Sequence, residues 1–162
     1  MMAYLLDSNI FIQAKNLHYG FEFCPAFWDW LSIGNDNGKV FSIEKVGDEL
    51  SAQEDELSAW AIENLKLFLK PDDEVVEALG KVSDWTVDQN YEQAALNTFF
   101  QVADFYLVAH ALAKQHVVVT HEVPSNSTKK IKIPNVCIGL KIKVMTPYEM
   151  LRLERAKFVL GS

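Results

Sequence analysis

The sequence predicts one α/β domain with a central, mainly parallel β-sheet flanked by helices. Short apolar runs that suit buried strands alternate along the chain with longer segments whose apolar residues recur at helical spacing. A hydrophobic fraction of 49% with 23% charged residues is typical of a chain that buries its own core. The 162 residues contain no internal repeat and no Pro-, Gly- or Ser-rich linker, so we expect residues 1–162 to form a single domain.

Strands are expected where short apolar runs stand between turn-forming or helical segments. These runs lie at residues 3–6, 40–43, 117–120 and near 144–145. The first run is followed by Asp7-Ser8-Asn9, which we expect to form a polar loop. Strands separated by helices pair in parallel, and the ligand sites of such sheets lie at the carboxyl ends of the strands.

Helices are expected between these strands. Their ranges are 25–31, 44–70 as one or two helices, 72–74 onward, 91–100, 104–113 and 147 onward. Pro25 and Pro147 suit the first turn of a helix, Pro71 ends the pattern of 44–70, and the stretch 34–38 ends the first helix. The apolar density of 104–113 predicts that this helix is mostly buried.

Composition excludes several classes of protein. No run of about 20 apolar residues is present, and residues 1–7 lack the basic start of a signal peptide. We therefore expect a cytoplasmic protein that does not enter a membrane. Cys24 and Cys137 belong to no C-x-x-C pair, so we expect buried free thiols rather than a disulfide or a thiolate zinc site.

Charge is unevenly distributed along the chain. Residues 1–122 contain 7 basic and 20 acidic side chains, whereas residues 123–162 contain 8 basic and 2 acidic ones. Such a basic segment suits a polyanionic partner. The alternative is a solvated basic surface that balances an acidic body.

Four acidic residues are candidates for a common site at the carboxyl edge of the sheet. Asp7 directly follows the first expected strand, and Glu122 follows the strand 117–120 by two residues. Glu49 lies one to two helical turns beyond the strand 40–43, and Asp104 begins the buried helix. Two carboxylates about 4 Å apart repel by about 4 kcal/mol at an effective dielectric constant of 20, so a cluster requires protons or cations. Oxygen ligands favour Mg²⁺ or Mn²⁺, ions that support phosphodiester hydrolysis.

Three of these acids also have a purely structural interpretation. Asp7 can form an Asx turn with the residues that follow it, and Asp104 can be the N-cap of its helix. Glu49 can be a solvated residue on a helix surface. The convergence of the four acids on one edge, rather than any single residue, is what favours a metal site.

The order of these residues resembles that of the PIN domain over the whole chain. The resemblance rests on a strand followed by Asp7-Ser8-Asn9, on Glu49-Leu50, on Asp104 at the start of an Ala-rich helix, and on Val118-Val119-Thr120-His121-Glu122. Residues 6–15, 23–25, 27–30 and 131–134 are in addition similar to an uncharacterised PIN-like group described as domain of unknown function 4411. The fold that this resemblance implies is a PIN-like three-layer sandwich.

The PIN superfamily includes VapC-type toxins, which are Mg²⁺- or Mn²⁺-dependent ribonucleases. The resemblance implies that this chain is a metal-dependent endoribonuclease, the toxin of a bacterial type II toxin–antitoxin pair, a homodimer, and the partner of a cognate antitoxin. Carried over residue by residue, Asp7, Glu49 and Asp104 match the three core acidic ligands. Glu122 stands where the family usually has Asp, and its longer side chain can reach the metal from a displaced backbone or through water.

Further residues are expected to assist these acids. Ser8, Asn9 and Thr120 are candidates for hydrogen bonds that orient the ligating carboxylates, although turn chemistry explains them nearly as well. Contacts with the RNA backbone are expected from His121, Lys129, Lys130 and Lys132. For His121 the alternative is an exposed histidine without a catalytic role.

Two other functions remain open. The chain can be a PIN fold that serves as a protein-binding module with weak or absent catalysis. Asp7-Ser8-Asn9 also resembles the Asp-x-Asp start of haloacid-dehalogenase phosphatases, but Asn9 cannot protonate a leaving group. Nucleotide binding through a phosphate loop is not indicated, because the stretch 34–40 has the wrong glycine spacing and lacks the required Ser or Thr.

Overall fold

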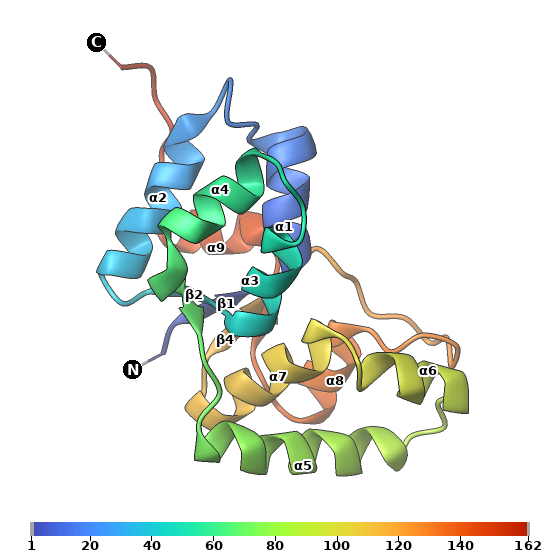
Figure 1. Cartoon of the computed structure of the whole chain (residues 1–162). Coiled ribbons are helices and arrows are strands. Elements are labelled where there is room, and N and C mark those ends of the chain that lie inside the picture. The colour runs from blue at the N-terminus through green and yellow to red at the C-terminus, as the bar shows by residue number, and fades with distance from the viewer. Residues whose placement is uncertain (1, 162) are drawn as a thin grey trace.

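Five parallel strands form one sheet at the centre of the structure, a computed structural model that describes residues 2–161. The strands are β1 (Tyr4–Leu6), β2 (Val40–Ile43), β3 (Phe68–Leu69), β4 (Val117–Val119) and β5 (Val144–Met145). Their order in the sheet is β3-β2-β1-β4-β5, and every neighbouring pair is parallel. The predicted α/β fold with a parallel central sheet is confirmed (Figure 1).

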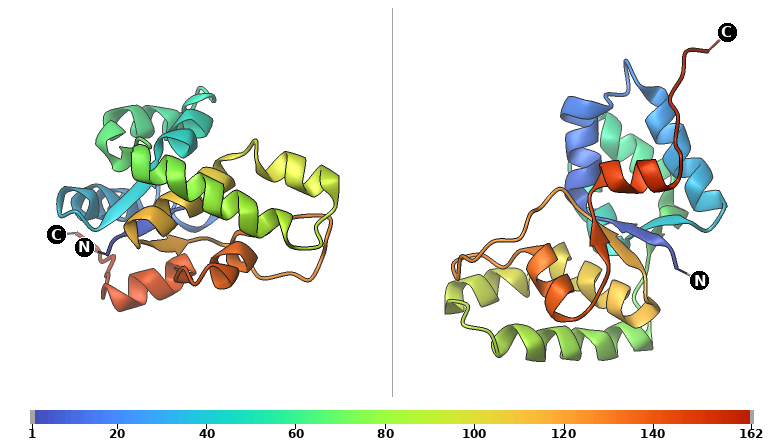
Figure 2. Two further views of the ribbon diagram at one scale, coloured as in Figure 1. Left: turned by 90° about the horizontal axis from the view of Figure 1, so that it is seen from below. Right: turned by 180° about the vertical axis from the view of Figure 1, so that it is seen from behind.

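Helices cover both faces of this sheet. They are α1 (Ser8–Gln13), α2 (Pro25–Asp36), α3 (Glu44–Ser51), α4 (Glu56–Glu63), α5 (Asp73–Val87), α6 (Gln93–Phe99), α7 (Ala103–Lys114), α8 (Ile133–Gly139) and α9 (Pro147–Leu153), with a π-helical turn η1 (Ala14–His18) and a 3₁₀ turn η2 (Leu65–Leu67). Helices α1, α2, α4 and α9 lie on one side of the sheet, and α5, α7 and α8 lie on the other (Figure 1 and Figure 2). The sheet is therefore the middle of three layers, and α6 extends the α7 layer beyond it.

Burial on both faces explains why the strands are recognisable as apolar runs. Leu5 and Leu6 of β1 and Val118 and Val119 of β4 have no exposed surface. A parallel strand covered by helices on both sides needs apolar residues at every position rather than at alternate ones. The same holds for α7, which packs against β2, β4 and α5 and is mostly buried, as its sequence predicts.

The structure corrects two predicted boundaries. The expected loop at Asp7-Ser8-Asn9 is wrong, because α1 begins at Ser8 and Asp7 is its extended N-cap residue. The second helix, α2, continues to Asp36, beyond its expected end. Gly34 lies inside this helix, and a Cβ atom there would lie only 2.7 Å from a methyl group of Val40 in β2. The glycine therefore allows the helix to pass close to the strand instead of ending the helix.

Two elements have too little sequence signal to be predicted. β3 contains only Phe68 and Leu69, and it lies within the range that we expected to be helical. Its pairing with Ser42 and Ile43 of β2 makes it a strand. Helix α8 was not expected, since its seven residues are too few to show a helical period.

Both cysteines are free thiols. Cys137 of α8 is buried as expected, whereas Cys24 is only half-buried.

Among residues 2–161, no helix combines the length and apolar character that a membrane crossing requires.

Candidate metal centre

Asp7 and the segment Thr120–Glu122 lie side by side at the carboxyl edge of the sheet. Strands β1 and β4 are parallel neighbours, and Leu6 is paired with Val119. The backbone N–H of Asp7 continues this pairing by donating a hydrogen bond to the carbonyl of Val119, with an N···O distance of 3.0 Å. The sheet itself therefore brings together residues that are more than 110 positions apart in the sequence.

The Asp7 carboxylate is buried and oriented by hydroxyl groups. Its side chain makes no capping hydrogen bond to α1. Instead, the Thr120 hydroxyl donates to Oδ2 at 2.8 Å, and the Ser8 hydroxyl lies 3.4 Å from Oδ1. Burial raises the pKa of Asp7 to about 6, the Thr120 hydrogen bond opposes this rise, and the charges of Glu122 and Glu49 add to it. These contacts argue against the Asx-turn interpretation of Asp7.

Thr120 and Asn9 link the two strand ends into one network. Besides donating to Asp7, the Thr120 hydroxyl oxygen accepts the backbone N–H of Glu122 at 3.1 Å, and it lies 3.4 Å from Nδ2 of Asn9. The Asn9 side-chain oxygen accepts the backbone N–H of His121 at 3.3 Å. The structure thus places Ser8, Asn9 and Thr120 around the predicted acids.

Asp104 is not the N-cap of its helix. Val102 occupies that position, and Asp104 lies in the first turn of α7. Burial raises the pKa of Asp104 to about 7, and the charges of Asp7, Glu122 and Glu49 raise it further, while Lys130 lowers it. The four predicted acids therefore lie close enough for their charges to act on Asp104.

The two glutamates are held less firmly. Glu49 is exposed near the end of α3. Glu122 is half-buried, and its Oε2 atom lies 3.3 Å from the backbone nitrogen of Ile133, which donates to it at the start of α8. Among residues 2–161, no three His, Cys, Asp or Glu side chains stand close enough to share one ion. The chemistry of the carboxylate donors suits a hard divalent cation.

A cluster of rings beside the acids was not predicted. The rings of His18 and His121 have centroids 5.7 Å apart, and Nε2 of His18 lies 3.0 Å from the hydroxyl oxygen of Tyr148. Burial and the proximity of His18 lower the pKa of His121. His18 comes from η1 and Tyr148 from α9, and because no short spacing joins them to His121, only the fold reveals the cluster.

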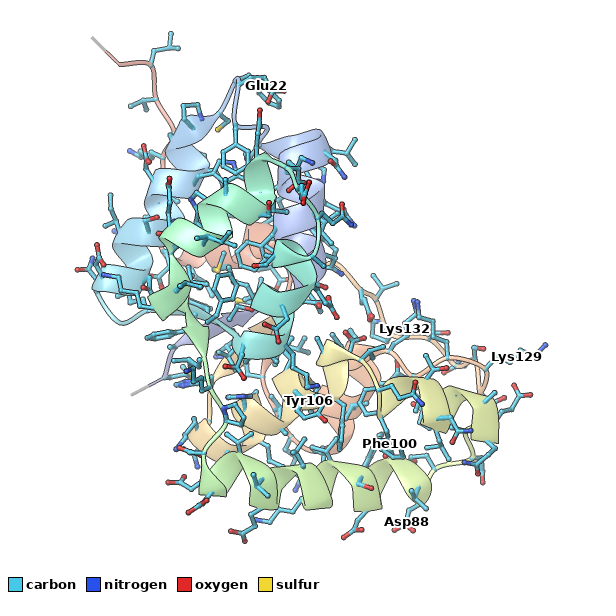
Figure 3. The ribbon with its side chains drawn as sticks, viewed as in Figure 1. Glu22, Asp88, Phe100, Tyr106, Lys129 and Lys132 are labelled. Atoms are coloured by element: carbon cyan, nitrogen blue, oxygen red, sulfur yellow. The ribbon has the colours of Figure 1, made fainter. Side chains whose placement is uncertain are left out.

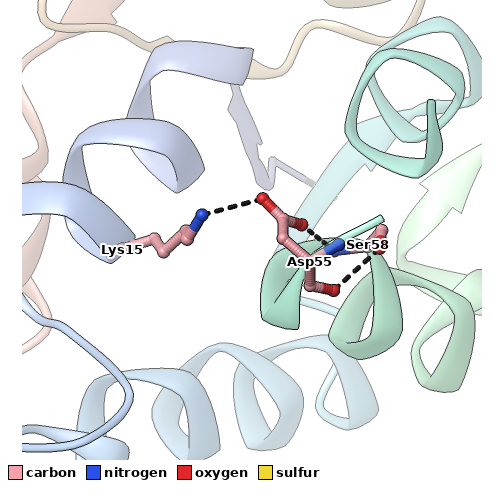
Figure 4. Close-up of polar contacts among 3 residues, drawn as sticks. All are labelled: Lys15, Asp55 and Ser58. Atoms are coloured by element: carbon pink, nitrogen blue, oxygen red, sulfur yellow. Dashed lines mark hydrogen bonds and ion pairs between the residues drawn. The ribbon is translucent and has the colours of Figure 1, made fainter. Parts of the chain in front are cut away.

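An ion pair fixes the loop that follows α3. Lys15 of η1 contacts Asp55 with an Nζ···Oδ2 distance of 2.7 Å (Figure 4). Asp55 is the N-cap of α4, and it forms a reciprocal capping box with Ser58. The pair thereby ties η1 to the segment between α3 and α4, and its two residues line a surface pocket together with Glu49.

The predicted RNA-binding lysines lie on the loop between β4 and α8. Lys129 and Lys130 line a cavity together with Glu49 and Asp104. Lys132 is the N-cap residue of α8 and does not line this cavity. Figure 3 shows Lys129 at the outer end of the loop, with its amino group directed into solvent. The basic loop is thus a neighbour of the acidic edge.

Comparison with known proteins identifies a family and no characterised relative. No curated protein and no solved structure matches this chain. A protein family described as domain of unknown function (DUF4411) matches residues 4–158. Because that match covers nearly all of the 162 residues, the chain belongs to the DUF4411 family.

Proposed function

We propose that this protein is a PIN-type, metal-dependent endoribonuclease that hydrolyses phosphodiester bonds of RNA. The observation that carries the proposal is the acidic edge of the sheet, where burial and mutual repulsion raise the pKa of Asp7 to about 6 and that of Asp104 to about 7. Carboxyl groups with raised pKa values from separate elements are typical of functional sites. A divalent cation would relieve the repulsion between them.

Asp7, Glu49 and Asp104 would hold Mg²⁺ or Mn²⁺, with Glu122 as a direct or water-mediated ligand. Such an ion supplies a Lewis acid and lowers the pKa of bound water. The chain's own residues prepare the site. Thr120 and Ser8 orient the Asp7 carboxylate, and Lys130 adds positive charge where an RNA phosphate would approach Asp104.

The biological setting belongs to the same proposal. We place the enzyme in the cytoplasm, as a homodimeric toxin that a cognate antitoxin protein holds inactive. This role predicts that expression of the chain arrests growth, and that Asp7→Asn abolishes the arrest at equal protein levels. Growth arrest that persists in the variant would contradict a catalytic toxin.

The test of the proposed function is calorimetric titration of Mn²⁺ into metal-free protein. We expect saturable binding by the wild type, and none by folded Asp7→Asn/Asp104→Asn. Asp48→Asn/Asp88→Asn is the matched control, because both residues are exposed and neither is one of the four proposed ligands. Thermal unfolding of the same samples should show that Mn²⁺ at 100 times its dissociation constant stabilises only the wild type and the control, by about 2.7 kcal/mol.

Cleavage of labelled RNA with and without Mn²⁺ completes the test. The double variant should be inactive, while the control cleaves at the wild-type rate. Folded wild type that binds no Mn²⁺ and cleaves no RNA would contradict the proposal in favour of a protein-binding module. Release of phosphate from small monoesters without RNA cleavage would favour a phosphatase.

A further inference from the structure

A cavity of about 450 Å³ opens beside the acidic edge. It lies between α6, the start of α7, the end of α3 and the loop that carries Lys129 and Lys130. One part of its lining is apolar and consists of Ala95, Phe99, Val102 and Ile131. The volume falls within the range of about 300–1,000 Å³ that is usual for small-ligand sites.

The rest of the lining is polar and divided by charge. Glu49 and Asp104 belong to the acidic edge, whereas Lys129 and Lys130 are cationic. The charge of Lys130 is close enough to Asp104 to lower its pKa against the effect of burial. Apolar side chains next to lysines suit a single ligand that carries both a planar, weakly polar ring and a negatively charged group.

The loop that closes this cavity is anchored at three points. The backbone N–H of Glu92 donates to the carbonyl of Thr128 at 2.9 Å, which fastens the loop to the start of α6. Ser125 exchanges two hydrogen bonds with the Asn135 side chain, at 2.9 and 2.8 Å. Ile131 is only 4% exposed. The cavity is therefore a preformed feature of the fold rather than a gap beside a free loop.

We propose that this cavity holds one unstacked nucleobase of single-stranded RNA, with the neighbouring phosphate on Lys129 and Lys130. This inference rests on the proposed function, since it places the base beside the acids that would act on the backbone. A base that is paired inside a duplex cannot enter a pocket without leaving its stack. The cavity thus makes the enzyme selective for unpaired nucleotides.

Thr98 provides a test that leaves the acids and lysines intact. It is exposed on α6 and lines the cavity, so that Thr98→Phe fills the cavity from its rim. Asn97→Phe is the matched control, because Asn97 is the exposed neighbour on the same helix and does not line the cavity. The circular dichroism and the unfolding midpoint of both variants show that they are folded.

Binding is measured by fluorescence anisotropy in EDTA, where no metal-dependent cleavage occurs. The probes are a labelled RNA hexamer of adenylates and an abasic hexamer with the same number of phosphates. We expect the wild type and Asn97→Phe to bind the adenylate hexamer roughly tenfold more tightly than the abasic one, the scale of one stacked base. Thr98→Phe should bind both hexamers equally, at the weaker affinity.

The outcomes separate this inference from the proposed function. If the wild type binds the adenylate hexamer more tightly than the abasic one and Thr98→Phe removes this difference, the result supports the nucleobase pocket, even if the protein cleaves no RNA. Equal binding of both hexamers by the wild type overturns the pocket, even if cleavage with Mn²⁺ occurs. Adenosine monophosphate that competes as well as the hexamer overturns the assignment to an RNA strand in favour of a free nucleotide.

Discussion

At the scale of single residues, Asp7 and Asp104 show how burial changes the chemistry of an ordinary side chain. Burial is the largest cause of the raised pKa of both carboxyl groups. At Asp7, the hydrogen bond from the Thr120 hydroxyl offsets part of the rise in pKa. At Asp104, the charges of three acids raise the pKa further, and the charge of Lys130 lowers it. In metal-free protein, ionised Asp104 therefore lowers the free energy of unfolding.

We predict that Asp104→Asn stabilises the metal-free protein at pH 8. Because the pKa is about 7 in the folded state and 3.8 in the unfolded state, the stability that the protonated group contributes is lost as pH rises through 7. Asparagine mimics the protonated form and keeps that stability. A full shift of this size corresponds to about 4 kcal/mol, and partial exposure reduces the expected gain to about 1–2 kcal/mol.

Urea denaturation in EDTA checks this prediction. The gain should be largest at pH 8 and smaller at pH 5, because the folded wild type is still mostly protonated at pH 5. Asp48→Asn, an exposed position on α3, is the control and should change stability by less than about 0.5 kcal/mol at either pH. A gain that is equal at both pH values would show that Asp104 does not titrate as the structure indicates.

At the scale of secondary-structure elements, the close approach of α2 to β2 depends on one missing side chain. A Cβ atom at Gly34 would meet Val40, which is buried in β2 and 1% exposed. The backbone there is helical, so steric contact rather than backbone conformation requires the glycine. By contrast, a Cβ atom at Gly80 on α5 would meet nothing within 4 Å.

We predict opposite effects for alanine at these two glycines. Gly34→Ala forces α2 away from β2 and should destabilise the protein by about 1–3 kcal/mol, the usual cost of overpacking. Gly80→Ala should stabilise it by about 0.5–1 kcal/mol, because alanine favours the helix and adds no clash. Urea denaturation measures both, and Val40→Ala should offset part of the Gly34→Ala loss. Equal effects at the two positions would contradict the packing.

At the scale of the whole molecule, acidic and basic residues that are far apart in the sequence lie close together in the fold. Of the 22 acidic residues, 20 precede residue 123, whereas the last forty residues contain 8 basic and only 2 acidic side chains. The fold returns the basic loop 129–132 to the acidic edge, where Lys129 and Lys130 share a cavity with Glu49 and Asp104. A polyanion that reached this surface would meet cations next to the candidate metal ligands.

We predict that changing Lys129, Lys130 and Lys132 to Gln weakens RNA binding and reduces its dependence on salt. Loss of three phosphate contacts on a single strand lowers the slope of log K against log salt by about 2. Lys141→Gln/Lys143→Gln/Lys157→Gln removes equal charge from exposed positions outside the loop. Binding of labelled RNA between low and high salt compares the two triple variants. An unchanged slope in the first would remove these lysines from the RNA interface.

The sequence alone determined the elements whose signal is local. Short apolar runs predicted β1, β2, β4 and β5, and the density of apolar residues predicted a mostly buried α7, because elements covered on both sides favour apolar side chains at successive positions. The acids that follow these strands could be predicted as candidate ligands from the sequence, because parallel strands direct their carboxyl ends to one edge of the sheet.

Tertiary structure decided what depends on contact between distant segments. β3 is a strand only because Phe68 and Leu69 pair with β2, and His18 meets His121 and Tyr148 only when η1, β4 and α9 are assembled. The pairing of β1 with β4 likewise brings the Thr120 hydroxyl to the Asp7 carboxylate. Asp7 and Thr120, like His18 and His121, are more than one hundred residues apart in the sequence, so no local pattern encodes these contacts.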